Sequence, residues 1–230
     1  MTGEKKTSLK LRIYEEIKDR IIRCEYMPGM QLNEDLLCSH FGSSRTPVRD
    51  ALSRLEQEGL VTIHAKRGVQ ITDVSISAVN ELFEVRMRIE PYAVRTYGSR
   101  MSDEVYASYM RRFSKGVGNK ADFYALDDAF HHAFIDVSDN RYLKMIHGIT
   151  ADQSARFRIL SDADDRLEQT QQEHYRIAAC CLRRDWTAAA NEMRNHLEMS
   201  KKAIISYALN QDFETENVFS RLKKSVEETE

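Results

Sequence analysis

Two acidic residues and two histidines occur together in the stretch ALDDAFHHAF at residues 125–134. Asp127 lies four residues before His131, which is one turn away if the stretch is helical. Asp128 and His132 have the same spacing. Carboxylate oxygens and imidazole nitrogens in this pattern could ligate a metal ion, act as an acid/base pair in an enzyme, or form a polar helix face without chemistry. Spacing alone does not choose between these three interpretations.

A helical wheel separates the two pairs. Around Phe130, an apolar face spanning about 40° on either side is formed by Phe123, Leu126, Phe134 and Val137. Asp127 and His131 fall at the border of this face, at about 60° and 100° from Phe130. Asp128 and His132 fall at about 160° and 200°, on the side expected to face solvent. We therefore predict that Asp127 and His131 point into the protein.

Two more histidines lie on the apolar sides of predicted helices. His174 shares its side with Ile177 and Cys181, and His196 lies near Leu197. Three imidazoles and one carboxylate suit a borderline divalent ion, with zinc expected first and nickel or manganese as alternatives. Four protein ligands would leave two positions of a six-coordinate ion for water or an oxygen ligand. A buried polar cluster without a metal is the competing interpretation.

The elements expected to carry these residues are long helices. The chain has only three prolines and nine glycines in 230 residues, and from residue 76 onward the apolar residues repeat with a helical period. Such a series of helices forms an antiparallel bundle, so the fold class is mainly α. The predicted helices span residues 76–98, 102–115, 120–137, 140–160, 166–184 and 186–210.

The first third of the chain has shorter elements. Residues 33–42 and 44–59 are predicted to be two helices with the N-caps Asn33 and Ser44, and Gly42 is placed to end the first of them. Two helices joined in this way form a helix-turn-helix, whose second helix enters the DNA major groove by its N-terminal end. The first turn of that helix presents hydroxyls and guanidinium groups suited to phosphates and guanine edges, on Ser44, Arg45, Thr46 and Arg49.

A β-hairpin is predicted after the helix-turn-helix. LVTIHAKRGVQIT, at residues 60–72, has the pattern of a strand, a tight turn and a second strand. Its basic tip is formed by Lys66, Arg67 and Gly68. A helix-turn-helix followed by such a wing, with cations on both parts, favours binding to double-stranded DNA over the alternative of an ordinary solvated helical hairpin.

The N-terminal residues resemble the winged-helix domain of GntR-type bacterial transcription regulators, most closely in SRTPVRDALSRLEQEGLV at residues 44–61. The resemblance implies that Arg45, Thr46 and Arg49 read or clamp an operator. It also implies that the wing tip, with Arg67 and Gly68, lies near the minor groove.

The C-terminal part is similar to the effector domain of the FadR-like branch of this family, the FCD domain. The similar segments are DDAFHHAFIDVSDNRYL and EHYRIAACCLRRDWTAAANEMRNHL. The similarity implies a divalent metal bound by Asp127, His131, His174 and His196. It also implies that Arg86, and more weakly Arg156, pairs with the carboxylate of an effector. For Arg86, a surface salt bridge with Glu90 is the alternative.

Composition sets outer limits on function. The formal net charge of −2 does not by itself indicate nucleic acid, so a local cationic surface has to carry that prediction. The first ten residues lack the apolar core of a signal peptide, and no apolar run approaches the ~20 residues of a membrane span. We expect a cytoplasmic protein without a membrane partner.

Together these features predict a winged helix-turn-helix domain at residues 1–74, an effector-binding and dimerisation domain at 75–212, and a tail at 213–230 that extends beyond the family pattern. The expected function is a homodimeric, ligand-responsive repressor that binds a palindromic operator and senses a small organic acid through its metal site. The alternative is a metalloenzyme fused to a DNA-binding domain, in which the metal activates water.

Overall fold

The computed structural model describes residues 8–65, 68–116, 118–161 and 166–210. Contacts divide the chain into two compact units, one made of Met1–Ser75 with Gly148–Leu160 and the other of Ile76–His147 with Ser161–Glu230. The first unit therefore includes a segment, 148–160, that the sequence assigned to the second domain. The predicted tail at 213–230 and the wing-tip residues Lys66 and Arg67 lie outside the described residues.

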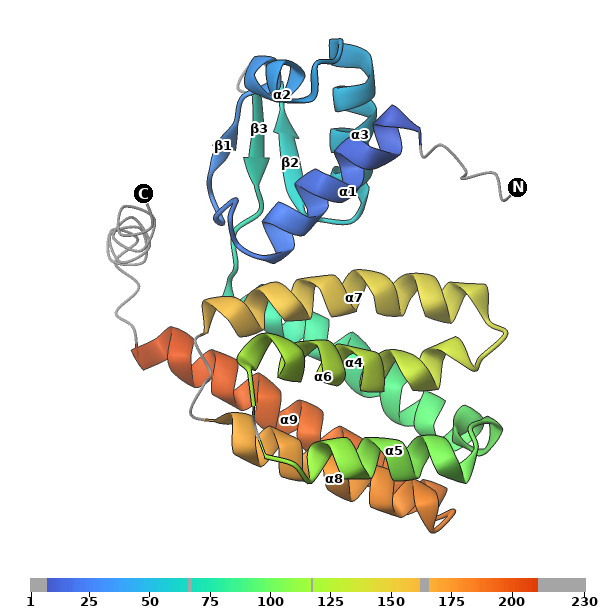
Figure 1. The fold of residues 1–230 in the computed structure, drawn as a ribbon. Coiled ribbons are helices and arrows are strands. Elements are labelled where there is room, and N and C mark those ends of the chain that lie inside the picture. Colours follow the sequence, from blue (N-terminus) through green and yellow to red (C-terminus); the bar gives the residue numbers. More distant parts are fainter. Residues whose placement is uncertain (1–7, 66–67, 117, 162–165, 211–230) are drawn as a thin grey trace, which may run out of the picture. The chain divides into compact units, whose positions relative to one another are not determined.

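The first unit is a winged helix-turn-helix (Figure 1). Its elements are α1 (Leu9–Ile22), β1 (Gln31–Leu32), α2 (Glu34–Phe41), α3 (Arg45–Gln57), β2 (Val61–His64) and β3 (Gly68–Ile71). The strands form an antiparallel sheet in the order β1-β3-β2. The two-residue strand β1 was not predicted, because it is too short to show an alternating pattern and exists only through its pairing with β3.

Local sequence signals explain the ends of the helices in this unit. The side chain of Asn33 accepts hydrogen bonds from the backbone N–H groups of Asp35 and Leu36, at 2.8 and 3.2 Å, which confirms it as the N-cap of α2. Gly42 ends that helix in the left-handed conformation, with φ of 57°. Ser44 is the N-cap of α3, but its side chain makes no cap hydrogen bond.

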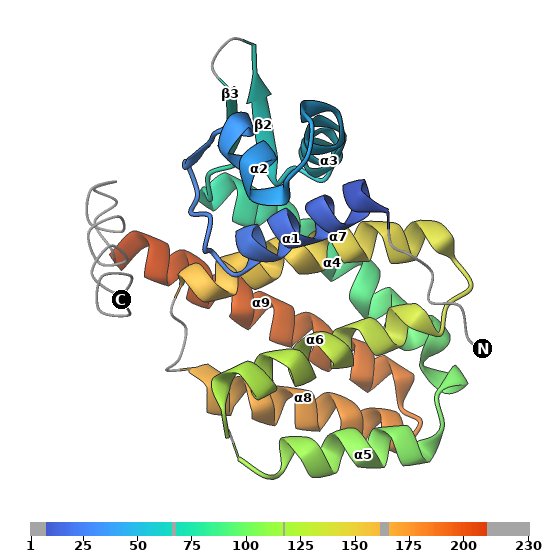
Figure 2. The same cartoon turned by 45° about the horizontal axis from the view of Figure 1, so that its top comes forward.

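The second unit is a helical bundle (Figure 2). α9 packs against both α4 and α8, α5 packs against α8, and α6 packs against α4. The mainly helical fold is thereby confirmed, and each helix boundary lies within two residues of its prediction. The helices are α4 (Ile76–Tyr97), α5 (Asp103–Phe113), α6 (Lys120–Asp136), α7 (Arg141–Leu160), α8 (Leu167–Leu182) and α9 (Trp186–Asn210). Of α7, only the part up to His147 belongs to the second unit, and the part from Gly148 on belongs to the first.

Aromatic rings fill the interior of the bundle beside α6. The side chains of Tyr106, Phe113, Phe130 and Phe134 are each at most 3% exposed. Their ring centroids lie 5.2 to 6.3 Å apart in successive contacts. This packing holds α6 in one orientation about its axis. Within the described part of the chain, no helix is long and apolar enough to cross a membrane.

Candidate functional site

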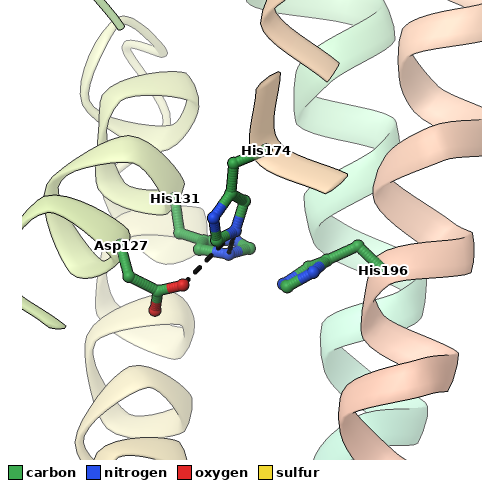
Figure 3. Close-up of side chains that lie close together, drawn as sticks. All are labelled: Asp127, His131, His174 and His196. Atoms are coloured by element: carbon green, nitrogen blue, oxygen red, sulfur yellow. Dashed lines mark hydrogen bonds and ion pairs between the residues drawn. The ribbon is translucent and has the colours of Figure 1, made fainter. Parts of the chain in front are cut away.

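Four polar side chains meet inside the helical unit (Figure 3). Asp127 and His131 come from α6, His174 from α8 and His196 from α9. One potential ligand atom from each residue lies within 4.8 Å of the other three. None of the four is more than 7% exposed. We call these four residues the Asp/His cluster.

The spacing inside the Asp/His cluster matches the edges of a metal coordination shell. Nε2 of His174 lies 3.1 Å from Nε2 of His131 and 3.3 Å from Oδ1 of Asp127. Ligand atoms about 2.1 Å from a single ion are about 3.0 to 3.4 Å from their neighbours in tetrahedral or octahedral geometry. These two separations are therefore the ones expected between neighbouring ligands of a single divalent ion.

Burial keeps two of the imidazoles neutral, because charging them inside the bundle costs their hydration. Burial, reinforced by the neighbouring histidines, holds the pKa of His174 and of His196 well below the ordinary value. A neutral imidazole carries the lone pair that a metal needs. At neutral pH these two residues can bind an ion without first losing a proton to the solvent.

Arg86 lies next to the Asp/His cluster but is bonded to another residue of its own helix. Its Nε donates to Oε1 of Glu90, and Oε2 of Glu90 lies 2.5 Å from Nδ1 of His131. Glu90 is only 2% exposed. Burial opposes the charge of this carboxylate, but Arg86 and His131 outweigh burial and hold its pKa well below the ordinary value. The structure thus contains the salt bridge between Arg86 and Glu90 that the sequence analysis named as the alternative. The pair is buried, whereas a surface pair was expected.

The helical wheel was right about the inner pair and partly wrong about the outer pair. Asp127 and His131 are buried, whereas Asp128 and His132 are half-buried and do not point fully into solvent. The ring of His132 lies 4.6 Å from the ring of His147 in α7. α6 is thus covered on this side too, which a single-helix projection does not reveal.

His147 is buried beside Glu90. The spacing of residues in the sequence gave no reason to place His147 there. It is 1% exposed, and its Nε2 lies 3.9 Å from Oε1 of Glu90. Burial, partly offset by Glu90, lowers the pKa of His147 to about 3. His147 therefore packs beside the carboxylate as a neutral ring.

Arg156 does not lie at the Asp/His cluster. Its guanidinium belongs to the first unit, where Nη2 donates to the carbonyl of Thr72 at 2.8 Å and Nη1 donates to Oε1 of Gln153 at 2.9 Å. The side chain is 1% exposed. The structure therefore does not bring Arg156 together with the predicted metal ligands, because the helical period shows only that one face of α7 is covered and not which unit covers it.

We expect Arg156→Ala to destabilise the first unit and to leave metal binding unchanged. Removing the guanidinium deletes buried, charge-assisted hydrogen bonds and opens a cavity, which costs about 2–4 kcal/mol. Thermal unfolding followed by circular dichroism measures the loss. Arg23→Ala is the matched control, because Arg23, the C-cap of α1, is exposed in the same unit and forms an ion pair with Asp19 of that helix. Weaker metal binding in Arg156→Ala would contradict this assignment.

The predicted DNA-contacting residues of α3 lie together on the surface of the first unit. Ser44, Arg45, Thr46 and Arg49 are all exposed, and so is Gly68 at the start of β3. In the absence of DNA, Arg45 pairs with Asp35 at 2.9 Å and Arg49 with Glu34 at 2.8 Å. Of the predicted contact residues, Arg45, Arg49 and Gly68 line an open groove of about 760 Å³ between α2, α3 and the wing strands.

The contact of Glu90 with His131 and the carboxylate–arginine pair of Glu173 with Arg166 were missed by sequence reasoning. The Oε2 atom of Glu173 lies 2.8 Å from Nδ1 of His196, and both carboxylate oxygens of Glu173 accept hydrogen bonds from Arg166. Glu173 directly precedes His174 in the sequence, but nothing in that position relates it to His196. A buried acidic residue on an otherwise apolar face was the only available signal.

Comparison with known proteins agrees with both units. The family model described as the FCD domain matches residues 81–199, and the model described as bacterial regulatory proteins, gntR family, matches residues 9–71. Among curated relatives, the HTH-type transcriptional regulator YdhC of Bacillus subtilis is 28% identical over 200 residues, covering 84% of this chain and 89% of the relative. The HTH-type transcriptional repressor GlaR of Escherichia coli is 29% identical over 198 residues, covering 80% and 90%.

Solved structures share the fold. A transcriptional regulator GntR from Rhodococcus superposes with a TM-score of 0.69 at 20% identity, covering 87% of this chain and 99% of that one. McbR/YncC of E. coli gives a TM-score of 0.70 at 18% identity, covering 87% and 98%.

Proposed function

The chain belongs to the GntR family of bacterial regulatory proteins and carries an FCD domain, and we propose that it is a metal-dependent, ligand-responsive repressor that acts as a homodimer in the cytoplasm. The chain is a transcriptional regulator with a DNA-binding and an effector-binding domain. The relatives are transcription regulators, which decides against the metalloenzyme alternative.

The Asp/His cluster is the observation that supports metal dependence. Three imidazoles and one carboxylate from three helices converge within 4.8 Å, and they are buried where an unpaired polar group is costly. Zinc is the first choice for this ligand set, with nickel or manganese as alternatives. A bound ion would link α6, α8 and α9, and it would offer its remaining positions to an oxygen ligand.

The effector is proposed to be a small carboxylate. A carboxylate oxygen is a suitable ligand for the open positions of such an ion. Binding would shift the population between two arrangements of the dimer, and the effector-bound arrangement would no longer match the half-site spacing of the operator. A repressor of this kind is released from DNA when the organic acid is present.

The proposed dimer would use the exposed apolar residues of the helical unit. Val85 and Tyr92 of α4 are 36% and 45% exposed, and Tyr142 and Met145 of α7 are 58% and 56% exposed. Large apolar side chains grouped on two helices are typical of a protein interface. Two copies would supply the two recognition helices that a palindromic operator requires.

One experiment tests the regulator as a whole. Fragments of the genome of the source organism are selected on the zinc-loaded full chain, and the bound sequence is measured by fluorescence anisotropy at moderate salt. We expect a short inverted repeat bound at nanomolar concentration. Addition of the correct small carboxylate should weaken this binding at least tenfold, and a chelator should remove the response. Failure to select any specific sequence would refute DNA regulation by this chain.

A further inference from the structure

Two of the three histidines in the Asp/His cluster are bonded to a buried glutamate, and each glutamate is bonded to an arginine. The first chain of contacts runs from Arg86 through Glu90 to Nδ1 of His131, and Glu90 contacts Arg86 with Oε1 and His131 with Oε2. All three residues are at most 7% exposed. Because both carboxylate oxygens accept hydrogen bonds, Nδ1 of His131 must be the donor.

The second chain of contacts has the same order of residues but comes from other helices. Arg166 donates to both oxygens of Glu173, at 2.7 and 2.8 Å, and Oε2 of Glu173 lies 2.8 Å from Nδ1 of His196. Glu173 is 9% and His196 is 4% exposed. Arg166 also donates to the hydroxyl of Ser200 at 3.1 Å, which fixes the guanidinium between α8 and α9.

His174 is held in a different way. Within the described part of the chain, its Nδ1 has no hydrogen-bond partner. Its ring packs against Phe113 and Phe130, at centroid distances of 5.0 and 5.3 Å. The Nδ1 side of His174 is thus held by packing, whereas Nδ1 of His131 and of His196 is held by a glutamate.

We propose that Glu90 and Glu173 are positioning residues that fix the Nδ1–H tautomer of His131 and His196, while Arg86 and Arg166 hold the two carboxylates in place. In the tautomer with the proton on Nδ1, the lone pair of each ring lies on Nε2, the nitrogen that faces the centre of the Asp/His cluster. This inference rests on the proposed metal site. It assigns Arg86 to the support of a ligand and not to direct binding of the effector.

Nuclear magnetic resonance of the metal-free full chain tests the tautomers directly. Long-range ¹H–¹⁵N correlation spectra distinguish a protonated ring nitrogen from one with a lone pair. We expect the lone pair on Nε2 of His131 and His196 in the wild-type protein at neutral pH. Lone pairs on Nδ1 of both rings would overturn the inference, whatever the metal affinity.

Metal titration tests the consequence. Glutamine keeps the shape and an acceptor oxygen but loses the charge, so Glu90→Gln and Glu173→Gln should each weaken Co²⁺ binding about 10–100-fold. The visible absorption of the bound Co²⁺ should also change, which loss of folding alone does not explain. The matched controls are Glu84→Gln in α4 and Glu168→Gln in α8, both at exposed positions. Melting temperatures of the metal-free variants check that each one folds.

The outcomes separate this inference from the proposed function. Wild-type affinity and an unchanged spectrum in both variants would overturn the inference and leave the metal site intact. Absence of Co²⁺ binding by the wild-type chain would overturn both. Arg86→Gln adds a third readout, because weaker Co²⁺ binding without any organic acid supports a positioning role. A loss confined to the response to organic acids would instead identify Arg86 as an effector ligand and overturn its assignment here.

Discussion

Replacement of His131 by alanine is expected to abolish divalent-metal binding and, with it, the response to the effector. His131 contributes the Nε2 that lies 3.1 Å from Nε2 of His174, at the centre of the Asp/His cluster. Its removal takes away one of four ligands and leaves Glu90 without the hydrogen bond from Nδ1. Both losses act on the same site, so we expect affinity to fall by more than about 100-fold.

The measurement combines elemental analysis of the purified protein with calorimetric titration of Zn²⁺. His132→Ala is the matched control, because it removes an imidazole from the next position of α6. The Nδ1 atom of His132 is bonded to the backbone carbonyl of Asp128, 2.8 Å away, and its ring contacts His147. His132→Ala should therefore cost some stability but bind one equivalent of zinc. A stoichiometric ion in His131→Ala would contradict the ligand set.

The second large effect is expected at the DNA-binding surface. Arg45→Ala and Arg49→Ala should each weaken operator binding about 10–100-fold, since a guanidinium that contacts a guanine edge contributes about 1–3 kcal/mol. Both side chains are more than 60% exposed, and removing their pairs with Asp35 and Glu34 should change stability little. The double variant should bind the operator no more tightly than it binds random DNA.

Anisotropy titrations at several salt concentrations give the size and the kind of each loss. A base-reading arginine affects one sequence position, whereas a phosphate contact weakens all sequences and reduces the salt dependence. Arg23→Ala, at the exposed C-cap of α1, provides the control and should bind the operator normally. Metal binding should be unchanged in all three variants. If both α3 variants retained full operator affinity, α3 would not be the recognition helix.

The sequence by itself determined most of the local structure. Apolar residues at helical spacing located every helix of the bundle, because a helix that buries one face must repeat its apolar positions. The N-cap Asn33 was visible for the same local reason, and its side chain accepts from the N–H of Asp35 at 2.8 Å. The inward direction of Asp127 and His131 also followed from one helix alone.

Only the tertiary structure decided which residues support the Asp/His cluster. Glu90 reaches His131 across 41 positions of sequence, and Glu173 reaches His196 across 23. The same holds for Arg156, which bonds to Thr72 instead of the cluster. A periodic pattern records that a face is covered, but the partner that covers it depends on how distant helices pack, and that information is not local to any segment.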